Sequence, residues 1–417
     1  MNLQRPLKIF VPHCSDLLTD HRPHGDGLVA HGFIQRLALR GHELHVAVSE
    51  VDLKSPLPPN AHLHSIERVR TSALWGRLDY MRQVRKLFLR LGKDVTFDLV
   101  HQLNPVYTGI SLGLSGCPSP IILGPYISEW PGDSPAINSP YRAMRALLEA
   151  VKRAIAAWQQ YYAGSLLLTT PAAAGRVIRR SYFSRAEMLP HGVDSDFFCP
   201  KDKRAAQSTL HESDAPEILF MANLGRRKGV FDLLHAFDRV AVRFPLSRLT
   251  VAGDGAELPE VQRAASALSA SGRISFVGRQ DRAGAVTLLQ NADIYCLPSH
   301  GEPYGLSAVE AMSCGKPLVV TDAGGLGCLV DDAGGLRVPV RDPERLAAAL
   351  CELIADPARR RKMGEHNRNR VLETMAWDRV IDRLEEIYMA AIKSKRHKDR
   401  KCAVPVTMPA PSPEDCA

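Results

Sequence analysis

The sequence predicts an α/β protein made of two parallel-sheet domains that face each other across a cleft. The chain has 417 residues, more than one hydrophobic core ordinarily supports. In both halves, short apolar runs typical of buried strands alternate with longer stretches of helical apolar spacing. A polar segment without periodicity, residues 201–216, separates the halves. Alternating strands and helices form parallel sheets covered on both faces, and we expect a ligand to bind between two such domains.

The first domain, residues 1–205, begins with a β-α-β unit. Its strands are "LKIFVP" and "HELHVAV", and the helix between them, "GLVAHGFIQRLALRG", ends at a glycine. Further buried strands are expected in "FDLVHQL", "SPIILG", "SLLLTT" and "AEMLP". Two basic stretches with helical spacing, residues 78–93 and 141–163, lie before and after the first two of these strands.

The second domain, residues 206–376, repeats this alternation. Its strands are expected in "EILFMA", "RLTVAG", "RISFVG", "DIYCLPS" and "PLVVTD", with helices such as "FDLLHAFDRVAVRF" between them. Residues 377–392 are predicted to form a C-terminal helix that returns to the first domain. Residues 393–417 are basic, then proline-rich, and poor in large apolar side chains, so we expect them to be disordered.

The composition is that of a soluble globular protein, with 45% hydrophobic and 24% charged residues. The chain has no apolar run of the ~18 residues that a membrane span needs, and its N-terminus lacks a signal-peptide core. We therefore expect a cytoplasmic protein. Nine scattered cysteines without a Cys-x-x-Cys pair indicate neither a disulfide framework nor a zinc site. The formal charge is +8, which hints at anionic partners.

The stretch "LPSHGEPYGLSAVEAM" carries the strongest chemical signal. A helix that begins near Leu306 offers free N–H groups and a positive dipole end to a phosphate, and Gly305 lets the anion approach the backbone. Glu302 precedes this helix, and Glu310 lies about 7.5 Å along its axis from Gly305. The two carboxylates would bracket an anion and contact hydroxyl groups on either side of a diphosphate. Alternatively, Glu302 is a turn residue and Glu310 lies on a solvated helix face.

Two further loops offer groups suited to an anion. "NLGRRKGVFDLLHAF" places Arg226, Arg227 and Lys228 just before a helix, where cations can neutralise a diphosphate; such a turn is also common on a solvated surface. "HGDGLVAHG" supplies Gly25 and Gly27 after the first strand, where a backbone can approach a ligand. It is not the dinucleotide-binding fingerprint, because its third glycine is displaced.

This combination resembles the retaining GT-B glycosyltransferases of the group-one type, which use nucleotide sugars. The resemblance is carried by Glu302, Gly305 and "EAMSCGKPLVV", and by "GRRKG", "VAGDGAELPEV", "ISFVG" and "DDAGGLRVPVRDPERLAAAL". These motifs cover residues 218 to about 378. The first domain matches more loosely, through its glycine loop, "LALRGHELHVAV" and "LPHGVDSDFF".

The resemblance implies two Rossmann-like domains and sugar transfer with retention at the anomeric carbon, without a metal or other cofactor. The nucleotide sugar is a substrate, and electrostatic stabilisation of the departing diphosphate is the main contribution of the protein. The implied site residues are Lys228 with Arg226 or Arg227 for the diphosphate, Glu302 for the donor sugar, Glu310 for the ribose, the peptide groups of Gly305, Leu306 and Ser307 for phosphate, Gly278 and Arg279 for the base, and Gly27 with Gly25 from the opposite domain.

The sequence departs from the family pattern in two places. The loop cations are contiguous, which leaves open which arginine binds the diphosphate. The usual Thr-x-His element reads "IILGPYISEW" here, so Tyr126, Ser128 or Glu129 would substitute for its histidine. His101 and Asn104, in "HQLNP", also end a strand and are candidates for the acceptor side, with capping or packing as the alternative role.

Other functions compete with glycosyl transfer. The acids of "DSD", residues 194–196, suggest a metal motif, but they lie in a segment that leads into the linker. The basic stretches 77–93 and 142–153 suggest peripheral contact with an anionic membrane, which would present a lipid acceptor at its inner surface; an ordinary amphipathic helix is the alternative. No motif for specific nucleic-acid binding is present. An epimerase or a non-catalytic nucleotide-sugar sensor remains the alternative function.

Overall fold

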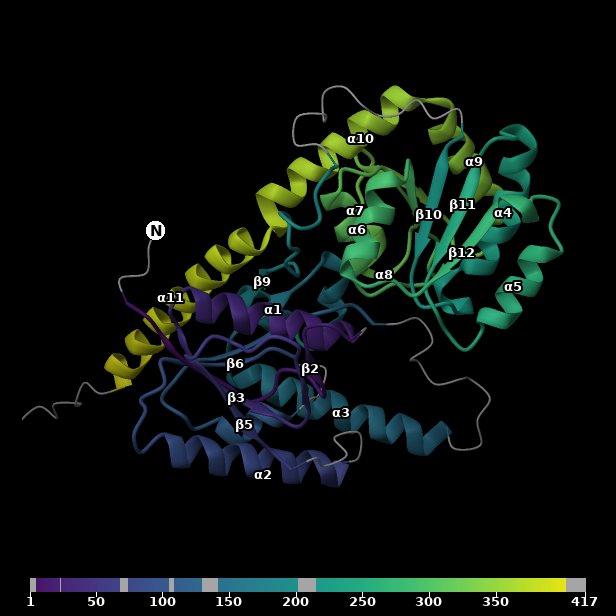
Figure 1. Ribbon diagram of the computed structural model, residues 1–417. Helices are drawn as coiled ribbons and strands as arrows, with labels where there is room; N and C mark the ends of the chain where they lie inside the picture. Colours follow the sequence, from purple (N-terminus) through teal and green to yellow (C-terminus); the bar gives the residue numbers. More distant parts are fainter. Residues whose placement is uncertain are drawn as a thin grey trace, which may run out of the picture.

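The computed structural model describes residues 5–22, 24–67, 74–104, 109–129, 142–201 and 215–402. The first domain contains a seven-stranded sheet with the order β5-β3-β1-β6-β7-β8-β9 (Figure 1). All of its strand pairs are parallel. The strands are β1 Lys8–Val11, β3 Glu43–Val48, β5 Ala61–Ser65, β6 Leu99–Gln102, β7 Ile121–Tyr126, β8 Ala163–Leu168 and β9 Ala186–Met188, and a separate two-stranded sheet joins β2 Leu18–Thr19 to β4 Val51–Asp52.

Helices cover both faces of the first sheet. On one face, α1 (Gly25–Leu39) and α11 (Trp377–Cys402) share a core that includes Phe33, Leu384 and Tyr388. On the other face, α2 (Leu74–Leu91) buries Tyr80 and Val84 against the strands. Helix α3 (Arg142–Tyr162) also belongs to this domain.

The second domain contains a six-stranded parallel sheet with the order β12-β11-β10-β13-β14-β15. Its strands are β10 Glu217–Met221, β11 Arg248–Ala252, β12 Ile274–Gly278, β13 Ile294–Leu297, β14 Leu318–Thr321 and β15 Gly335–Val338. The helices around it are α4 Val230–Arg243, α5 Leu258–Ser266, α6 Arg282–Asn291, α7 Leu306–Ser313, α8 Gly324–Leu329, α9 Pro343–Ala355 and α10 Pro357–Arg370. The predicted class, two α/β domains with parallel sheets, is confirmed. The predicted boundary at residues 205 and 206 falls outside the described residues.

Helix α11 connects the two domains a second time (Figure 1). It begins at Trp377, beside a backbone hydrogen bond in which the Val193 N–H donates to the Met375 carbonyl at 2.9 Å, and its buried side chains belong to the core of the first domain. The helix is longer than the predicted 377–392, since it continues to Cys402. The basic residues that we expected to be disordered from 393 onward therefore remain helical for ten positions, because Lys and Arg are good helix formers and favour the negative end of a helix dipole. Residues 403–417 lie outside the described part of the chain.

Among the described residues, no helix combines the length and the apolar character needed to cross a membrane.

Candidate active site

The strand order places two loops of the second domain side by side. Strands β10 and β13 are neighbours, while the chain continues from them toward opposite edges of the sheet. Such a switch point is where ligands bind in open α/β sheets, outside the carboxyl ends of the strands. The loop after β10 is joined there to the loop after β13, because the carbonyl of Arg227 accepts hydrogen bonds from the N–H of His300 at 2.8 Å and from Ser299 Oγ at 3.0 Å.

Lys228 and Glu302 form an ion pair at this point. The Lys228 ammonium donates to a Glu302 carboxylate oxygen, and the two side chains are 21% and 11% exposed. Gly229, which follows the lysine, has φ +72° and lies so close to the next loop that a Cβ there would be 1.8 Å from the Pro298 carbonyl oxygen. The sequence places glycine at this position because only glycine allows both the conformation and the contact. The loop therefore holds Lys228 as a partly buried cation next to a carboxylate.

Helix α7 begins beside this ion pair. Gly305 caps it with φ +89°, and the first N–H groups of the helix, on Leu306 and Ser307, point out of its N-terminus. The N-terminus of α1 lies opposite, since a Cβ on Gly25 would be 3.8 Å from Leu306 Cδ1. Two positive helix ends from different domains therefore face the same region, which favours a bound anion.

Glu310 lies on the second turn of α7 and is half-buried. Burial raises the pKa of its carboxyl to about 7, and the charge of Arg282 offsets part of this rise. Neither Glu302 nor Glu310 is on the outer surface. The two acids lie on either side of the α7 N-terminus, as the spacing in the sequence indicates.

The structure separates the three loop cations. The Arg226 guanidinium pairs with Glu260 and is 62% exposed, and its backbone N–H donates to Glu257 at 2.9 Å. This arginine therefore contacts the α5 region and not Glu302. The Arg227 side chain is exposed, and its carbonyl holds the neighbouring loop. Lys228 is the cation that contacts Glu302.

The other donor-side candidates have varied surroundings. Gly278 ends β12 with φ +67°, and a Cβ there would meet nothing within 4 Å, so space is open beside it. Arg279 is exposed next to it. Ser307 uses its hydroxyl oxygen to accept a 2.7 Å hydrogen bond from the buried Tyr295 hydroxyl, which leaves its peptide N–H at the helix end.

Gly27 does not have the surroundings that the resemblance implied. Its N–H donates to His24 Nδ1 at 3.1 Å, and a Cβ on it would lie 2.2 Å from the Leu17 carbonyl oxygen. The glycine is needed for packing within the first domain. Gly25, two residues earlier, is the glycine of this loop that faces α7.

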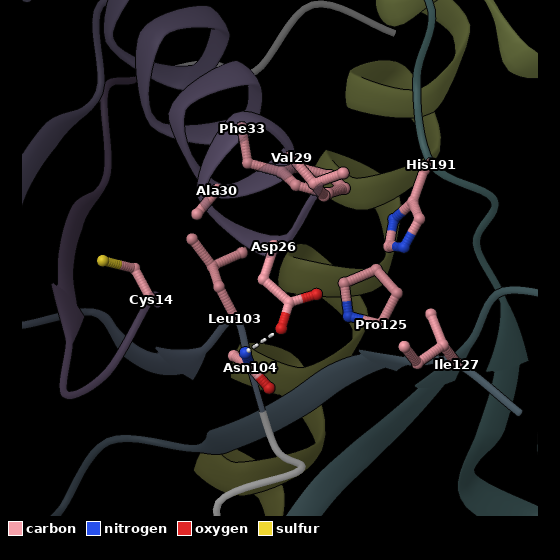
Figure 2. A pocket seen from close by; sticks show the side chains of 10 residues that line it. All are labelled: Cys14, Asp26, Val29, Ala30, Phe33, Leu103, Asn104, Pro125, Ile127 and His191. Carbon is pink, nitrogen blue, oxygen red and sulfur yellow. Dashed lines mark hydrogen bonds between the residues drawn. The ribbon is translucent and has the colours of Figure 1, made fainter. Parts of the chain in front are cut away.

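The first domain contains a pocket at its own switch point, between the ends of β1 and β6 (Figure 2). The pocket has a cavity volume of about 20 Å³ and opens to solvent. Asn104 Nδ2 donates to Asp26 Oδ2 at 3.0 Å on one side, and His191 lies on the other side. Among the described residues, His191 Nδ1 has no hydrogen-bond partner, and burial lowers the pKa of this histidine to about 3. The lining residues are Cys14, Asp26, Val29, Ala30, Phe33, Leu103, Asn104, Pro125, Ile127 and His191.

Of the acceptor-side candidates, Asn104 lines this pocket and His101 does not. His101 is fully buried, with Nδ1 2.6 Å from the Tyr388 hydroxyl and Nε2 2.9 Å from the Gly124 carbonyl. Burial lowers its pKa to about 4. Its side chain points from β6 into the core under α11, and both ring nitrogens are used in hydrogen bonds within that core. Sequence reasoning overlooked Asp26 and His191, although the quoted motifs "HGDG" and "LPHGVD" contain them.

The three candidates for the role of the missing histidine differ in exposure. Tyr126 is buried, and burial raises its pKa to about 12. Glu129 lies at the surface, where it pairs with Arg176 at 2.9 Å. Ser128 joins the domains, because its hydroxyl donates to the Pro303 carbonyl at 3.1 Å.

Of the two acids of "DSD", Asp194 contacts arginines. Asp194 lies 3.3 Å from Arg282 and 3.6 Å from Arg36. Its carboxylate thus lies between Arg36 of α1 and Arg282 of α6, one from each domain. These ion pairs do not require a metal ion.

Part of the chain matches a known protein family. Residues 201–370 match the model of the family "Glycosyl transferases group 1". Over 184 residues the chain is 35% identical to a glycogen synthase of Mycobacterium tuberculosis, covering 43% of this chain and 44% of that protein. Over 213 residues it is 33% identical to a D-inositol 3-phosphate glycosyltransferase of Corynebacterium jeikeium, covering 48% of this chain and 51% of that one. The chain thus matches about half the length of these relatives.

Solved structures of similar fold cover nearly the whole chain. A sucrose-phosphate synthase from Thermosynechococcus elongatus aligns with a TM-score of 0.69 at 20% identity, over 94% of this chain and all of that one. Anabaena HepE in complex with UDP aligns with a TM-score of 0.68 at 16% identity, over 92% of this chain and all of that one. The chain therefore has the GT-B fold, and its residues 201–370 match the group 1 glycosyltransferase family model.

Proposed function

We propose that the protein transfers a sugar from a nucleoside-diphosphate sugar to an acceptor, with retention at the anomeric carbon and without a metal in the reaction. One observation carries this proposal: the Lys228–Glu302 ion pair lies at the N-terminus of α7, directly opposite the N-terminus of α1. The arrangement offers a cation and two positive helix ends to a diphosphate, and a carboxylate to the sugar beside it. The Anabaena HepE structure that shares this fold holds UDP.

The donor would lie along α7. Its diphosphate would accept hydrogen bonds from the N–H groups of Leu306 and Ser307, with Lys228 as the counter-ion. Glu302 would accept from hydroxyl groups of the sugar, and Glu310 from those of the ribose. The base of the nucleotide would then lie in the open space beside Gly278 and Arg279.

The transfer step needs no nucleophile from the protein. The bond between the anomeric carbon and the diphosphate oxygen breaks, and the acceptor oxygen forms its bond on the same face of the sugar. The acceptor proton moves to an oxygen of the departing diphosphate. Lys228 and the helix ends stabilise the negative charge that develops there, which is commonly the largest protein contribution to such a step.

The acceptor would enter from the first domain. The pocket of Figure 2 combines an apolar lining with three polar groups, from Asp26, Asn104 and His191. A small number of converging polar groups in an apolar hollow is typical of a site that orients a ligand. We assign this pocket to the acceptor.

A second proposal concerns the membrane. Helix α3 exposes a set of large apolar side chains, with Leu147 65% and Trp158 59% exposed, and carries the exposed cations Lys152 and Arg153. Apolar and basic side chains on one surface helix favour contact with anionic lipid. We propose that α3 rests on such a membrane and brings a lipid acceptor to the first domain.

Ligand binding and product analysis test the main proposal. Nucleoside diphosphates and their sugars are screened by thermal shift, since a ligand present at 100 times its Kd stabilises by about 2.7 kcal/mol. The stabilising donor is then incubated with candidate acceptors, and NMR reports the anomeric configuration of the product. An inverted product would contradict retention. Binding without turnover for every acceptor would favour a sensor, and a changed but untransferred sugar would favour an epimerase.

A further inference from the structure

A cluster of histidines lies on the first domain, apart from the site described above. Glu43 and His45 come from β3, and His62 and His64 come from the neighbouring strand β5. The register pairs His45 with His62. Because side chains alternate between the two faces along a strand, all four lie on the same face of the sheet.

Three of these residues have the separations of a metal site. One potential ligand atom from each of Glu43, His45 and His62 lies within 4.8 Å of the other two. Glu43 Oε1 and His45 Nε2 are already 3.0 Å apart. Two ligands of a tetrahedral ion with bonds of about 2.0–2.1 Å are about 3.4 Å apart. Small side-chain rotations therefore suffice to close the three ligands around one ion.

The central ligand, His45, is held in place by its neighbours. It is 7% exposed. Its Nδ1 lies 3.0 Å from His64 Nε2, the two rings are stacked with an interplanar angle of 7°, and the Phe97 ring meets the His45 ring edge to face. With Nε2 bound to an ion, Nδ1–H donates to His64. A hydrogen bond of this kind fixes the orientation of most metal-binding histidines.

We propose that Glu43, His45 and His62 bind a divalent late transition ion, with Zn²⁺ as the reference, and that His64 orients His45. Two imidazoles and one carboxylate suit zinc and its neighbours, whereas Mg²⁺ and Ca²⁺ prefer oxygen ligands. His62 is exposed and Glu43 is half-buried, so an ion can enter from solvent, and water completes its coordination.

The position of this site separates it from catalysis. Glu43 and His62 lie at the beginnings of their strands, so the cluster is at the amino ends of the sheet. Ligands of open α/β sheets bind at the carboxyl ends, where the pocket of Figure 2 is found. Strand β5 is the edge strand, and its residues are half-buried or exposed. A bound ion would add a second link between this edge strand and β3.

The test uses the untagged full chain, stripped of metal and titrated with Zn²⁺ by calorimetry. We expect one ion per chain, and a melting temperature that rises with Zn²⁺. His62→Ala changes an exposed side chain and should fold normally, while its Zn²⁺ affinity falls at least about tenfold and the thermal shift is lost. His64→Ala should also lose about tenfold, because an orienting partner is removed. Bound Co²⁺ reports the ligands through its visible spectrum, which should change in His62→Ala.

His235→Ala is the matched control. His235 is an exposed histidine on α4 of the other domain, and its removal should leave Zn²⁺ binding unchanged. Equal affinity in the wild type and in His62→Ala would overturn the proposal. So would wild-type binding that is absent at millimolar Zn²⁺, or an affinity that falls equally in His235→Ala.

Discussion

Lys228 and Arg226 are cations two residues apart in one loop, yet the structure gives them different partners. Lys228 contacts Glu302 beside α7, while Arg226 pairs with Glu260 at the surface. Replacing each of them with alanine therefore distinguishes the effect of a cation that contacts Glu302 from the effect of a cation that merely lies in the same loop.

We predict that Lys228→Ala lowers kcat/KM for sugar transfer by about 10²-fold or more, because a charge that stabilises the leaving diphosphate is lost. Arg226→Ala should lower it only severalfold, because this guanidinium faces away. Steady-state kinetics of both variants test this prediction, and their melting temperatures check that both fold. Equal losses in the two variants would contradict the assignment of Lys228.

Glu310 makes stability depend on pH in a predictable direction. Its carboxyl has a pKa of about 7 in the folded protein against an ordinary value of 4.5. The folded chain thus holds this proton more tightly than the unfolded chain does. The associated stability is present below about pH 4.5 and is lost as the pH rises through 7.

We predict that Glu310→Gln matches the wild type in melting temperature at pH 5 and exceeds it at pH 8, since the amide removes the cost of a buried charge. The same variant should bind the donor nucleotide more weakly at pH 8, where the wild-type carboxylate accepts hydroxyl hydrogen bonds. Thermal unfolding and nucleotide titration at the two pH values measure both effects. A melting temperature difference that is the same at both pH values would refute this.

The candidate residues of the second domain could be expected to lie near one another because they are close together in the chain. Gly305, the α7 N-terminus and the two acids follow from helix geometry alone. The first-domain site is different, because its polar groups come from distant segments, residues 26, 104 and 191, and meet only in the folded chain. For the same reason the sequence could not show that His101 points into the core and that Gly25, not Gly27, faces α7.

At the scale of elements, the strands and most helices follow from apolar periodicity, and two helices show its limits. Helix α8 contains three glycines in six residues, a composition that disfavours helix. It forms because the N–H groups of Gly325 and Leu326 donate to the Glu302 carbonyl at 2.9 and 3.2 Å. Helix α11 continues beyond its predicted end. Its last turns are rich in Lys and Arg, which favour helix, but they lack the apolar spacing on which the prediction was based.

The packing of α1 on α11 supports a prediction about stability. A Cβ on Gly32 of α1 would lie 2.2 Å from Trp377 at the start of α11. Gly32→Ala should therefore destabilise the protein by about 1–3 kcal/mol, as overpacked core positions do. Gly116→Ala, where a Cβ meets nothing within 4 Å, should leave the stability nearly unchanged. Denaturant unfolding compares them, and similar midpoints for the two variants would argue against tight packing here.

Helix α3 carries the prediction for the membrane. The wild type should pellet with anionic vesicles at low salt and less so at high salt, because screening weakens charge attraction. Leu147→Glu with Leu148→Glu should abolish pelleting, since the apolar contact is lost, while a soluble acceptor is still glycosylated. Pelleting that the double variant retains would remove α3 from the interaction.

For the whole molecule, the proposed metal-free reaction and the proposed zinc site predict opposite responses to a chelator. Transfer at 25 °C should survive EDTA in the wild type and in His62→Ala, because Lys228 and two helix ends supply the positive charge. The melting temperature of zinc-loaded wild type should fall with EDTA, and that of His62→Ala should not. Transfer abolished by EDTA in both proteins would contradict metal-free catalysis without bearing on zinc at β3 and β5.

The return of α11 to the first domain has a consequence for the integrity of the molecule. A protease that cuts once between Lys201 and Ala215 produces two fragments, and the C-terminal one still inserts Val380, Leu384 and Tyr388 into the core of the N-terminal one. Helix α11 therefore holds the two fragments together after the cut. Separately expressed halves of this protein should reassemble when mixed, provided that the C-terminal half keeps its last helix.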